Sequence, residues 1–264
     1  MKASSLRSTV EAGAVVLGVQ CVVGTPSMVE FLGELGFDFV WIDLEHGGGS
    51  AHDTRHLEDL ARAAAAGGTE ILLRVTRADS SMINSVLDAG IRNLLVPQVR
   101  MASEVEDSIR ASRFEYQGEP GGRGLGSVRA NSWGRASAEW AQEEDLSTFV
   151  GVMIENRAAI ENLDRILYVL GLGFAYIGPS DLSVSYGCTK QTEDVRVTDA
   201  VRKIEEQARL ASVPVGKGVN SLEAGIEALK AGYQILRIGG DLAAIRASLG
   251  SWLNDLREVQ ASLH

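Results

Sequence analysis

The sequence is poor in cysteine, histidine and lysine, and it has no long hydrophobic run. Its two cysteines, Cys21 and Cys188, are too few for a disulfide framework or a cysteine zinc site. No apolar stretch reaches the roughly 18 residues that a membrane-spanning helix needs, and the first residues lack the apolar core of a signal peptide. We therefore expect a cytoplasmic protein without a membrane segment.

Positive charge is also scarce. Lys and Arg number 25 against 35 Asp and Glu, which gives a net charge of −10. A binder of nucleic acid or of an anionic membrane needs a basic face, so this balance argues against both partners as the main role. The basic residues are 20 arginines and 5 lysines. Chemistry that depends on a lysine therefore has few candidates.

In other respects the chain is typical of globular proteins, with 264 residues, of which 45% are hydrophobic and 23% charged. Short apolar runs rich in β-branched residues alternate with segments of helical period, and Gly or Asp separates them. The runs are continuously apolar, as expected for parallel strands that are covered on both faces. They are residues 15–23, 38–45, 70–75, 93–99, 149–155, 174–179, 213–219 and 235–240.

Eight strand–helix units in a chain of this length predict a (β/α)8 barrel, a TIM barrel, and residues 242–263 predict a long C-terminal helix. A doubly wound open sheet is the alternative, but no GxGxxG turn follows the first strand. No linker or repeat divides the chain, so residues 1–264 are predicted to form a single domain. About 50 residues separate the fourth and fifth strands, and we expect them to enlarge a loop at the carboxyl ends of the strands.

Polar side chains gather at these predicted carboxyl ends, where barrel enzymes place their active sites. Glu155 ends the fifth strand and Asp181 follows the sixth, so the two should face one space. Two carboxylates suit Mg²⁺ or Mn²⁺, because these ions take oxygen ligands and keep positions for water and substrate. A metal-free acid/base pair is the alternative. A single carboxylate at such a position is more often a helix cap, and it is the number of polar strand ends that favours a function.

His46 and Arg74 are the basic side chains at the strand ends. His46 has Asp43, Glu45 and a glycine-rich loop around it, which favours a functional role over a structural one. Arg74 closes an apolar strand, and its planar guanidinium can grip a carboxylate in two places, although a structural salt bridge is the alternative. The loop GGRGLG either brings backbone N–H groups to an anion or is a flexible turn.

Together these segments resemble the HpcH/HpaI aldolase family, the metal-dependent (class II) aldolases of 4-hydroxy-2-oxo acids. The resemblance covers nearly the whole chain and rests on GFDFVWIDLEHG, Arg74, LDAGIRNLLVPQV, PGGRGLGS, MIEN and IGPSDLS. It implies a lyase that adds pyruvate, or a similar 2-oxo acid, to an aldehyde. It also implies a divalent metal cofactor (Mg²⁺, Mn²⁺ or Co²⁺) and a homo-hexamer, a trimer of dimers, whose last helix packs on a neighbour. Docking of that helix within its own chain is the alternative.

The resemblance also assigns roles to individual residues. It places the metal ligands on Glu155 and Asp181, and the pyruvate-binding arginine on Arg74. The backbone around Ser180 and Asp181 matches the part of the family's site that meets the substrate carboxylate.

The resemblance further implies a catalytic pair of His46 with Asp88, which would tune the water or hydroxide that acts as base. From the sequence pattern alone, Asp88 would be a residue near the end of a helix. Asp43 and Glu45 match acidic positions near the metal-bound water.

One departure from the family concerns Met153, which stands where a glutamine close to the substrate is usual. The change leaves room for a related condensing enzyme that uses a thioester-derived enolate, like a citrate synthase or a malyl-thioester lyase. A Schiff-base aldolase is a further alternative and would use Lys217, the one lysine in a predicted strand. A non-catalytic barrel is the alternative from another class, and the presence of Glu155, Asp181 and Arg74 argues against it.

Overall fold

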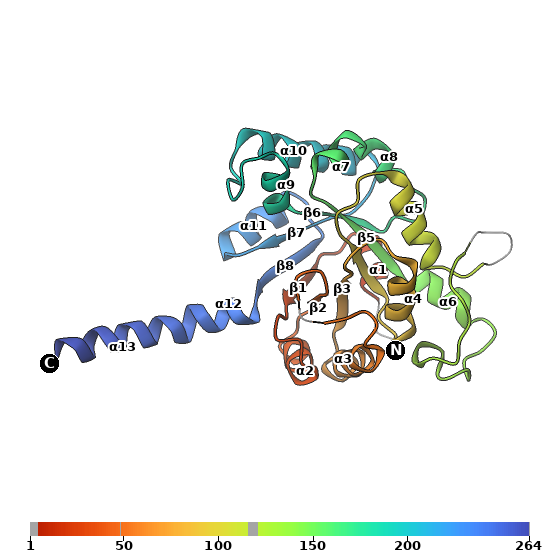
Figure 1. Ribbon diagram of the computed structural model, residues 1–264, viewed down its shortest axis with the longest axis horizontal. Coiled ribbons are helices and arrows are strands. Elements are labelled where there is room, and N and C mark those ends of the chain that lie inside the picture. The colour runs from red at the N-terminus through yellow and green to blue at the C-terminus, as the bar shows by residue number, and fades with distance from the viewer. Residues whose placement is uncertain (1–4, 48, 116–120, 264) are drawn as a thin grey trace.

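The eight apolar runs form the strands of a closed parallel barrel in a computed structural model that describes residues 5–47, 49–115 and 121–263. The order around the barrel follows the chain, and the last strand pairs with the first (Figure 1). The predicted (β/α)8 fold is therefore confirmed. The strands are β1 (Val16–Gln20), β2 (Phe39–Asp43), β3 (Glu70–Arg74), β4 (Asn93–Val96), β5 (Phe149–Ile154), β6 (Phe174–Ile177), β7 (Val215–Val219) and β8 (Ile235–Gly240).

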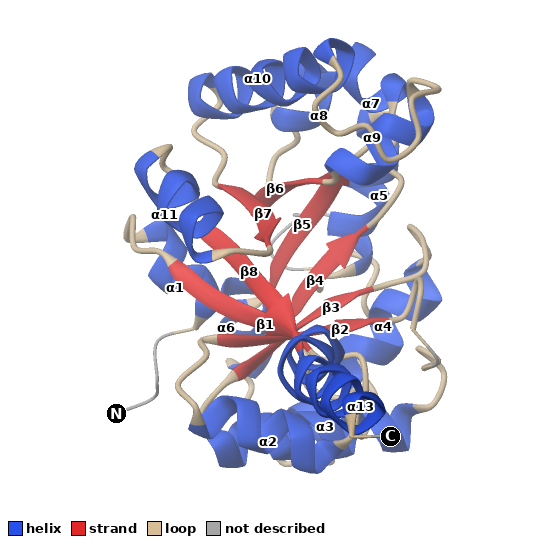
Figure 2. Cartoon of the chain, turned by 90° about the vertical axis from the view of Figure 1, so that its left-hand side faces the viewer, coloured by secondary structure: helices blue, strands red, loops and turns tan. Residues whose placement is uncertain are grey.

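Helices return the chain between successive strands and surround the barrel (Figure 2). Most begin where the sequence offers a capping side chain; Asp53, Asp79 and Ser221 each accept a hydrogen bond from the backbone of the first turn. The helices are α1 (Leu6–Glu11), α2 (Pro26–Glu34), α3 (Thr54–Gly67), α4 (Ser80–Asp88), α5 (Ala102–Ala111), η1 (Arg129–Asn131), α6 (Trp140–Ser147), α7 (Arg157–Glu161), α8 (Leu163–Leu167), α9 (Pro179–Ser185), α10 (Val195–Leu210), α11 (Leu222–Lys230), α12 (Asp241–Ile245), η2 (Arg246–Gly250) and α13 (Ser251–Ser262).

Apolar side chains fill two layers. The inner layer lies inside the barrel and contains aromatic residues such as Phe39 and Phe174. The larger outer layer lies between strands and helices and is rich in Leu, Ile and Val. Gly18 and Gly151 make room for the inner rings, because a Cβ at either position would lie 2.2 Å from a ring carbon. Strand β5 begins with apolar Phe149, and polar Glu155 follows directly after its carboxyl end. The polar residues therefore lie at the carboxyl ends of the strands, where barrel enzymes place their active sites.

The long segment before β5 lies at the opposite end of the barrel from the one predicted. Helix α5 follows β4 after a short turn, and the extra residues 112–148 come between α5 and β5. By then the chain has returned to the amino ends of the strands. The enlarged connection is therefore a helix-to-strand loop on that face, and it carries η1 and α6 (Figure 1). Helix α5 requires this placement, because it returns the chain to the amino ends of the strands before the extra residues begin.

The C-terminal helical segment, α12 to α13, leaves the barrel and points away from it (Figure 1). This confirms the predicted long helix. None of the described residues from 242 to 263 is buried in the single chain. Among the described residues, no helix has both the length and the apolar character that crossing a bilayer would need.

Candidate active site

Glu155 is the most buried ionisable side chain at the carboxyl ends of the strands, with no exposed surface. It follows β5 directly, and its Oε1 accepts a hydrogen bond of 2.7 Å from the backbone N–H of Gln98. Gln98 adopts a positive φ of 55°, an uncommon conformation for a residue other than glycine. Oε2 is buried and has no hydrogen-bond partner among the described residues. The fold thus holds a carboxylate in place and leaves one of its oxygens free for a ligand.

The surroundings of Glu155 disfavour its charge when no cation is bound. Burial raises its pKa to about 8, and the nearby charges of Asp181 and Glu45 add to the effect. Gly178 keeps the space beside it open, since a Cβ there would lie 2.8 Å from Oε2. A bound cation would supply the missing partner and remove the repulsion between the carboxylates.

Asp181 and Ser180 lie in the first turn of α9, which follows β6. Asp181 is half-buried and Ser180 is exposed. Within the part of the chain that the structure describes, no three His, Cys, Asp or Glu side chains form a metal cluster. A pair of carboxylates is nevertheless the donor set that Mg²⁺ uses when it keeps several waters or substrate oxygens. The residues therefore fit a hard divalent cation and do not fit structural zinc.

Arg74 is buried at the end of β3 and is held by two acidic side chains of the β2 end. The strand register pairs Asp43 with Arg74. Nε and Nη2 of the arginine donate to the two Asp43 oxygens at 3.0 and 2.5 Å, and Nη1 lies 2.9 Å from Oε2 of Glu45. Nη1 also donates to the sulfur of Met153 at 3.4 Å. The salt-bridge alternative for Arg74 is therefore the arrangement found.

This ion-pair cluster keeps Asp43 and Arg74 charged. Burial alone would raise the pKa of Asp43, but the hydrogen bonds and charge of Arg74 outweigh it and lower the pKa. Burial likewise opposes the charge of Arg74, and the bonds to Asp43 raise its pKa overall. The pKa of Glu45 is raised, because burial outweighs the charge of Arg74. Arg74 is thus a fixed cation at the pocket wall, with Asp43 as its main partner.

The structure does not bring His46 and Asp88 together within one chain. His46 follows β2 at the carboxyl end of the barrel, and its exposed ring has Nε2 3.9 Å from Oε2 of Glu45. Asp88 ends α4, so it lies at the other end of the barrel. There it pairs with the buried Arg123 at 3.4 Å, and Arg123 also meets Glu144 at 3.5 Å. A contact between His46 and Asp88 would need two copies of the chain.

The sequence patterns missed a polar cluster on the inner wall of the barrel. Arg237 on β8 has the same orientation as the inward-facing Ile235, and its Nη1 donates to Oε1 of Gln20 at 2.7 Å. The arginine lies against Trp41, whose indole also contacts Tyr176 at 5.0 Å between ring centroids. Burial raises the pKa of Tyr176 to about 12, so its hydroxyl stays protonated and can donate. Strand alternation in ILRIGG could have placed Arg237 inside, because residues two apart share a face.

Lys217 does not occupy the position that a Schiff-base aldolase would need. Its neighbours on β7, Gly216 and Gly218, face the interior, where they lie against Tyr176 and Arg237. The ammonium of Lys217 lies 4.8 Å from the ring centroid of Tyr233. Lys217 therefore points outward from the barrel toward Tyr233, although it lines part of the same cavity as Arg74.

A cavity of about 820 Å³ opens at the carboxyl ends of the strands, and its wall includes Arg74, Ser180, Asp181 and Arg237. It brings three of the six predicted site residues, Arg74, Ser180 and Asp181, together with the polar cluster on the inner wall, whereas Glu155 is not among the residues of its wall.

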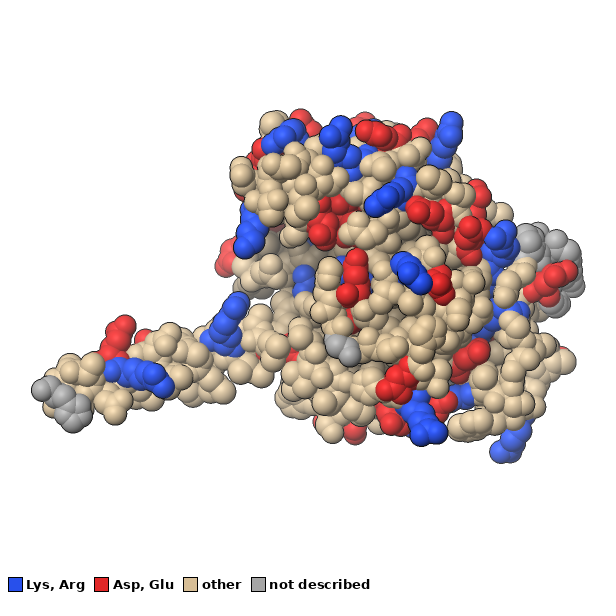
Figure 3. All heavy atoms as spheres, in the orientation of Figure 1, with Lys and Arg blue, Asp and Glu red and all other residues tan. Residues whose placement is uncertain are grey.

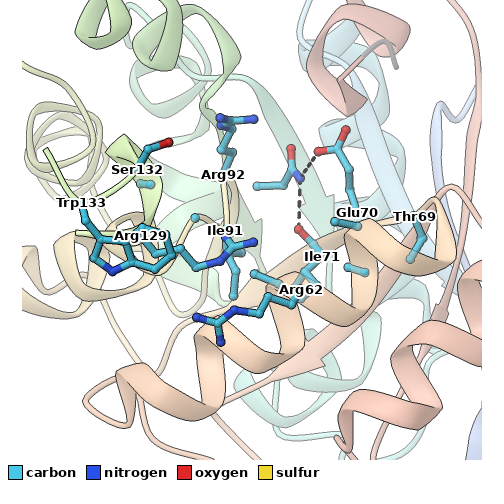
Figure 4. A pocket seen from close by; sticks show the side chains of 15 residues that line it. Arg62, Thr69, Glu70, Ile71, Ile91, Arg92, Arg129, Ser132 and Trp133 are labelled. Carbon is cyan, nitrogen blue, oxygen red and sulfur yellow. Dashed lines mark hydrogen bonds between the residues drawn. The ribbon is translucent and has the colours of Figure 1, made fainter. Parts of the chain in front are cut away.

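A second cavity, of about 580 Å³, lies at the amino ends of the strands, where Arg62, Arg92 and Arg129 line it (Figure 4). The carboxylate of Glu70 in its wall accepts a hydrogen bond of 2.7 Å from Asn93. No residue predicted for the site lies in this wall. The first cavity is therefore the candidate active site.

Comparisons with known proteins agree with this architecture. A family model described as HpcH/HpaI aldolase/citrate lyase matches residues 21–247. A hydroxypyruvate/pyruvate aldolase of Roseobacter denitrificans is 30% identical over 216 residues, which are 80% of this chain and 82% of the relative. A 2-keto-3-deoxy-L-rhamnonate aldolase of Klebsiella pneumoniae is 35% identical over 182 residues, or 69% and 65% of the two chains.

Solved structures give the same result over the whole barrel. An HpcH/HpaI aldolase from Desulfitobacterium hafniense superposes with a TM-score of 0.88 at 28% identity, covering 97% of this chain and 98% of its own. A citrate synthase superposes with a TM-score of 0.86, also at 28% identity, covering 97% and 99%.

Proposed function

Because the chain belongs to the HpcH/HpaI aldolase/citrate lyase family, we propose that it is a metal-dependent aldolase, a carbon–carbon lyase. It reversibly adds the enolate of pyruvate, or of a similar 2-oxo acid, to an aldehyde and forms a 4-hydroxy-2-oxo acid. The observation that carries the proposal is the fully buried Glu155, whose Oε2 has no hydrogen-bond partner among the described residues and whose charge interacts with those of Asp181 and Arg74.

Glu155 and Asp181 would hold the divalent ion, with Mg²⁺, Mn²⁺ and Co²⁺ as the candidates. When bound, such an ion polarises the carbonyl of the 2-oxo acid and so favours loss of a methyl proton. Arg74 presents a fixed positive charge to the negative oxygen that develops as the proton leaves. Asp43 orients this guanidinium through two hydrogen bonds, and the backbone at Ser180 and Asp181 would meet the substrate carboxylate.

The direct test strips the protein with EDTA and assays pyruvate with a panel of aldehydes, reading products by mass. We expect no product in EDTA and recovery with Mg²⁺, Mn²⁺ or Co²⁺. Glu155→Ala and Asp181→Ala should remove the recovery, because each deletes a ligand. Full activity of the parent protein in excess EDTA would refute the metal-dependent mechanism.

A condensing reaction is the second candidate, and the similarity to a citrate synthase favours it. Met153 replaces the usual glutamine next to Arg74, which changes the polarity where a second substrate would enter. Incubation with an acyl thioester and a 2-oxo acid, with free thiol as the readout, separates the two reactions. Thiol release without any product from pyruvate and aldehydes would favour the condensing enzyme.

We also propose that the functional form is a homo-hexamer, a trimer of dimers, in which α13 packs on a neighbouring subunit. The protruding segment exposes Trp252, Leu253 and Leu256, and its visible surface is mostly uncharged (Figure 3). On the barrel, Leu17 of β1 and Ile238 of β8 are exposed as well. These faces are apolar and unpaired in the single chain, and their mutual burial would support assembly.

Assembly would also explain how His46 and Asp88 could act as a catalytic pair, because one copy would supply the carboxylate to the histidine of another. Subunit complementation tests this arrangement. His46→Ala and Asp88→Ala proteins should each lose most activity, and co-refolded mixtures should regain part of it, because some sites then combine two intact residues. A mixture no more active than its components would contradict a site shared between subunits.

A further inference from the structure

We propose that Arg237, with Gln20, forms a second anion-binding subsite in the active-site pocket, and that it selects a carbonyl substrate with a carboxylate of its own. The inference rests on the proposed aldolase function and adds the chemical class of the second substrate. In the reaction, the proton leaves the methyl carbon of the 2-oxo acid, a carbon–carbon bond forms to the aldehyde carbon, and the aldehyde oxygen takes up a proton. The extra carboxylate is unchanged and serves only for binding.

The partners of Arg237 are all neutral. Its Nη1 donates to Oε1 of Gln20 at 2.7 Å and to the carbonyl of Gly239 at 3.2 Å. Within residues 5–47, 49–115 and 121–263, no carboxylate lies within ion-pair distance of this guanidinium. Arg74 in the same pocket differs, because it already forms ion pairs with Asp43 and Glu45. Arg237 therefore has no ionic partner among the described residues, and its charge is available to an anionic group of a ligand.

Two buried polar groups next to Arg237 also lack partners. Tyr176 is 3% exposed, and its hydroxyl lies beside the guanidinium without a hydrogen bond of good geometry. Nε1 of Trp41, likewise 3% exposed, has no acceptor among the described residues. Buried donors are normally paired, so these two point to an acceptor that arrives with a ligand. A carboxylate offers several acceptor positions at once.

The fold makes room for this arginine and places it against the same aromatic ring as Arg74. At Gly218, a Cβ would lie 2.3 Å from Nη2 of Arg237, so only glycine leaves the side chain in place. The guanidinium carbons of Arg74 and Arg237 lie 5.7 and 5.9 Å from the centroid of the same Trp41 ring. Both arginines therefore lie around one ring in the wall of one cavity, so a substrate that reacts near Arg74 can direct a carboxylate toward Arg237.

The test compares kcat/KM for glyoxylate and for glycolaldehyde, with pyruvate and Mg²⁺. The change in their ratio on mutation cancels the intrinsic reactivity of each aldehyde. Arg237→Leu should lower the glyoxylate-to-glycolaldehyde ratio by about 10- to 100-fold, as expected for loss of a charged hydrogen bond. Gln20→Glu should do the same with Arg237 intact, because it places a carboxylate where the amide now accepts.

Arg202→Leu is the matched control, because it removes an arginine from the wall of the same cavity. That side chain is exposed and pairs with Asp199 at 2.9 Å, so the ratio should change less than about twofold. If Arg237→Leu lowers kcat/KM equally for both aldehydes, the inference is overturned. If kcat/KM relative to glycolaldehyde is higher for glycolaldehyde phosphate than for glyoxylate, the assignment to a carboxylate is overturned.

A binding measurement separates this inference from the proposed function. Calorimetry on the Mg²⁺-loaded protein compares 2-oxoglutarate with 2-oxopentanoate, which has the same chain length and lacks the second carboxylate. We expect 2-oxoglutarate to bind at least about 10-fold tighter, and Arg237→Leu to abolish the difference. If no aldehyde gives product, the aldolase proposal fails and this comparison still decides on the subsite. Equal affinities in the parent protein overturn it.

Discussion

Replacing Glu155 by glutamine should make the metal-free protein more stable at neutral pH while destroying its activity. The side chain has no exposed surface, and burial raises its pKa from 4.5 to about 8. Between these values the unfolded chain has released the proton and the folded chain still binds it. The folded state therefore binds more protons, and stability falls as pH rises through this window.

The magnitude follows from the same shift. At pH 7 the difference corresponds to roughly 3 kcal/mol, since one pKa unit is worth about 1.4 kcal/mol. The buried amide of glutamine also costs free energy, so the substitution recovers only part of this stability. Unlike the cost of the carboxylate, the cost of the amide does not change with pH. At pH 8 the same shift is worth about 4 kcal/mol. If the amide recovers about half of it, Glu155→Gln should raise the melting temperature by about 4–8 °C at pH 8 and have little effect at pH 5, taking about 2–4 °C per kcal/mol for a chain of this size.

The assay is thermal unfolding in EDTA at several pH values and one protein concentration, because assembly also changes the melting temperature. Glu161→Gln is the control, since Glu161 is an exposed glutamate in α7. Added Mg²⁺ should raise the melting temperature of the parent protein and leave the Glu155→Gln protein unchanged. The reasoning fails if the difference between the Glu155→Gln and parent proteins is the same at pH 5 and pH 8.

Three further predictions address the pocket and the assembly. Arg74→Lys keeps the charge but loses the two-pronged contact with Asp43, so kcat should fall at least about 100-fold while the protein stays folded by circular dichroism. Gly178→Ala places a methyl group against Glu155, and equilibrium dialysis should show loss of Mg²⁺ binding; unchanged affinity would place the metal elsewhere. Truncation after Ile245 should convert the proposed hexamer to smaller species in sedimentation, and an unchanged mass would show that α13 takes no part in assembly.

The sequence predicts the carboxyl-end residues well because of one geometric rule. In an all-parallel barrel every strand ends on the same face, so Arg74 and Glu155 come to one end without any knowledge of loop structure. The position of residues 112–148 follows from the same rule, but only if the helix at 102–111 is counted first. Counting residues between strands alone gave the wrong face.

Other parts of the site depend on contacts that sequence patterns do not show. The partnership of Arg74 with Asp43 arises from the register of β2 and β3, which an apolar strand pattern leaves open. The separation of His46 from Asp88 depends on which end of the barrel each loop occupies. The sequence pattern did not predict Arg237 as a site residue, because it lies within a strand, where a charged residue is usually expected to face solvent.

The charges at the pocket divide into three sets with different needs. Asp43 and Arg74 pair at hydrogen-bond distance, so the guanidinium is held in position at the pocket wall before a substrate binds. The carboxylates of Glu155 and Asp181 repel each other, and a bound cation would reduce this repulsion. Arg237 donates only to neutral acceptors, so a bound anion would balance its charge. The pocket favours a cation near Glu155 and an anion near Arg237. It is therefore suited to a substrate that binds a metal at one end and carries a carboxylate at the other.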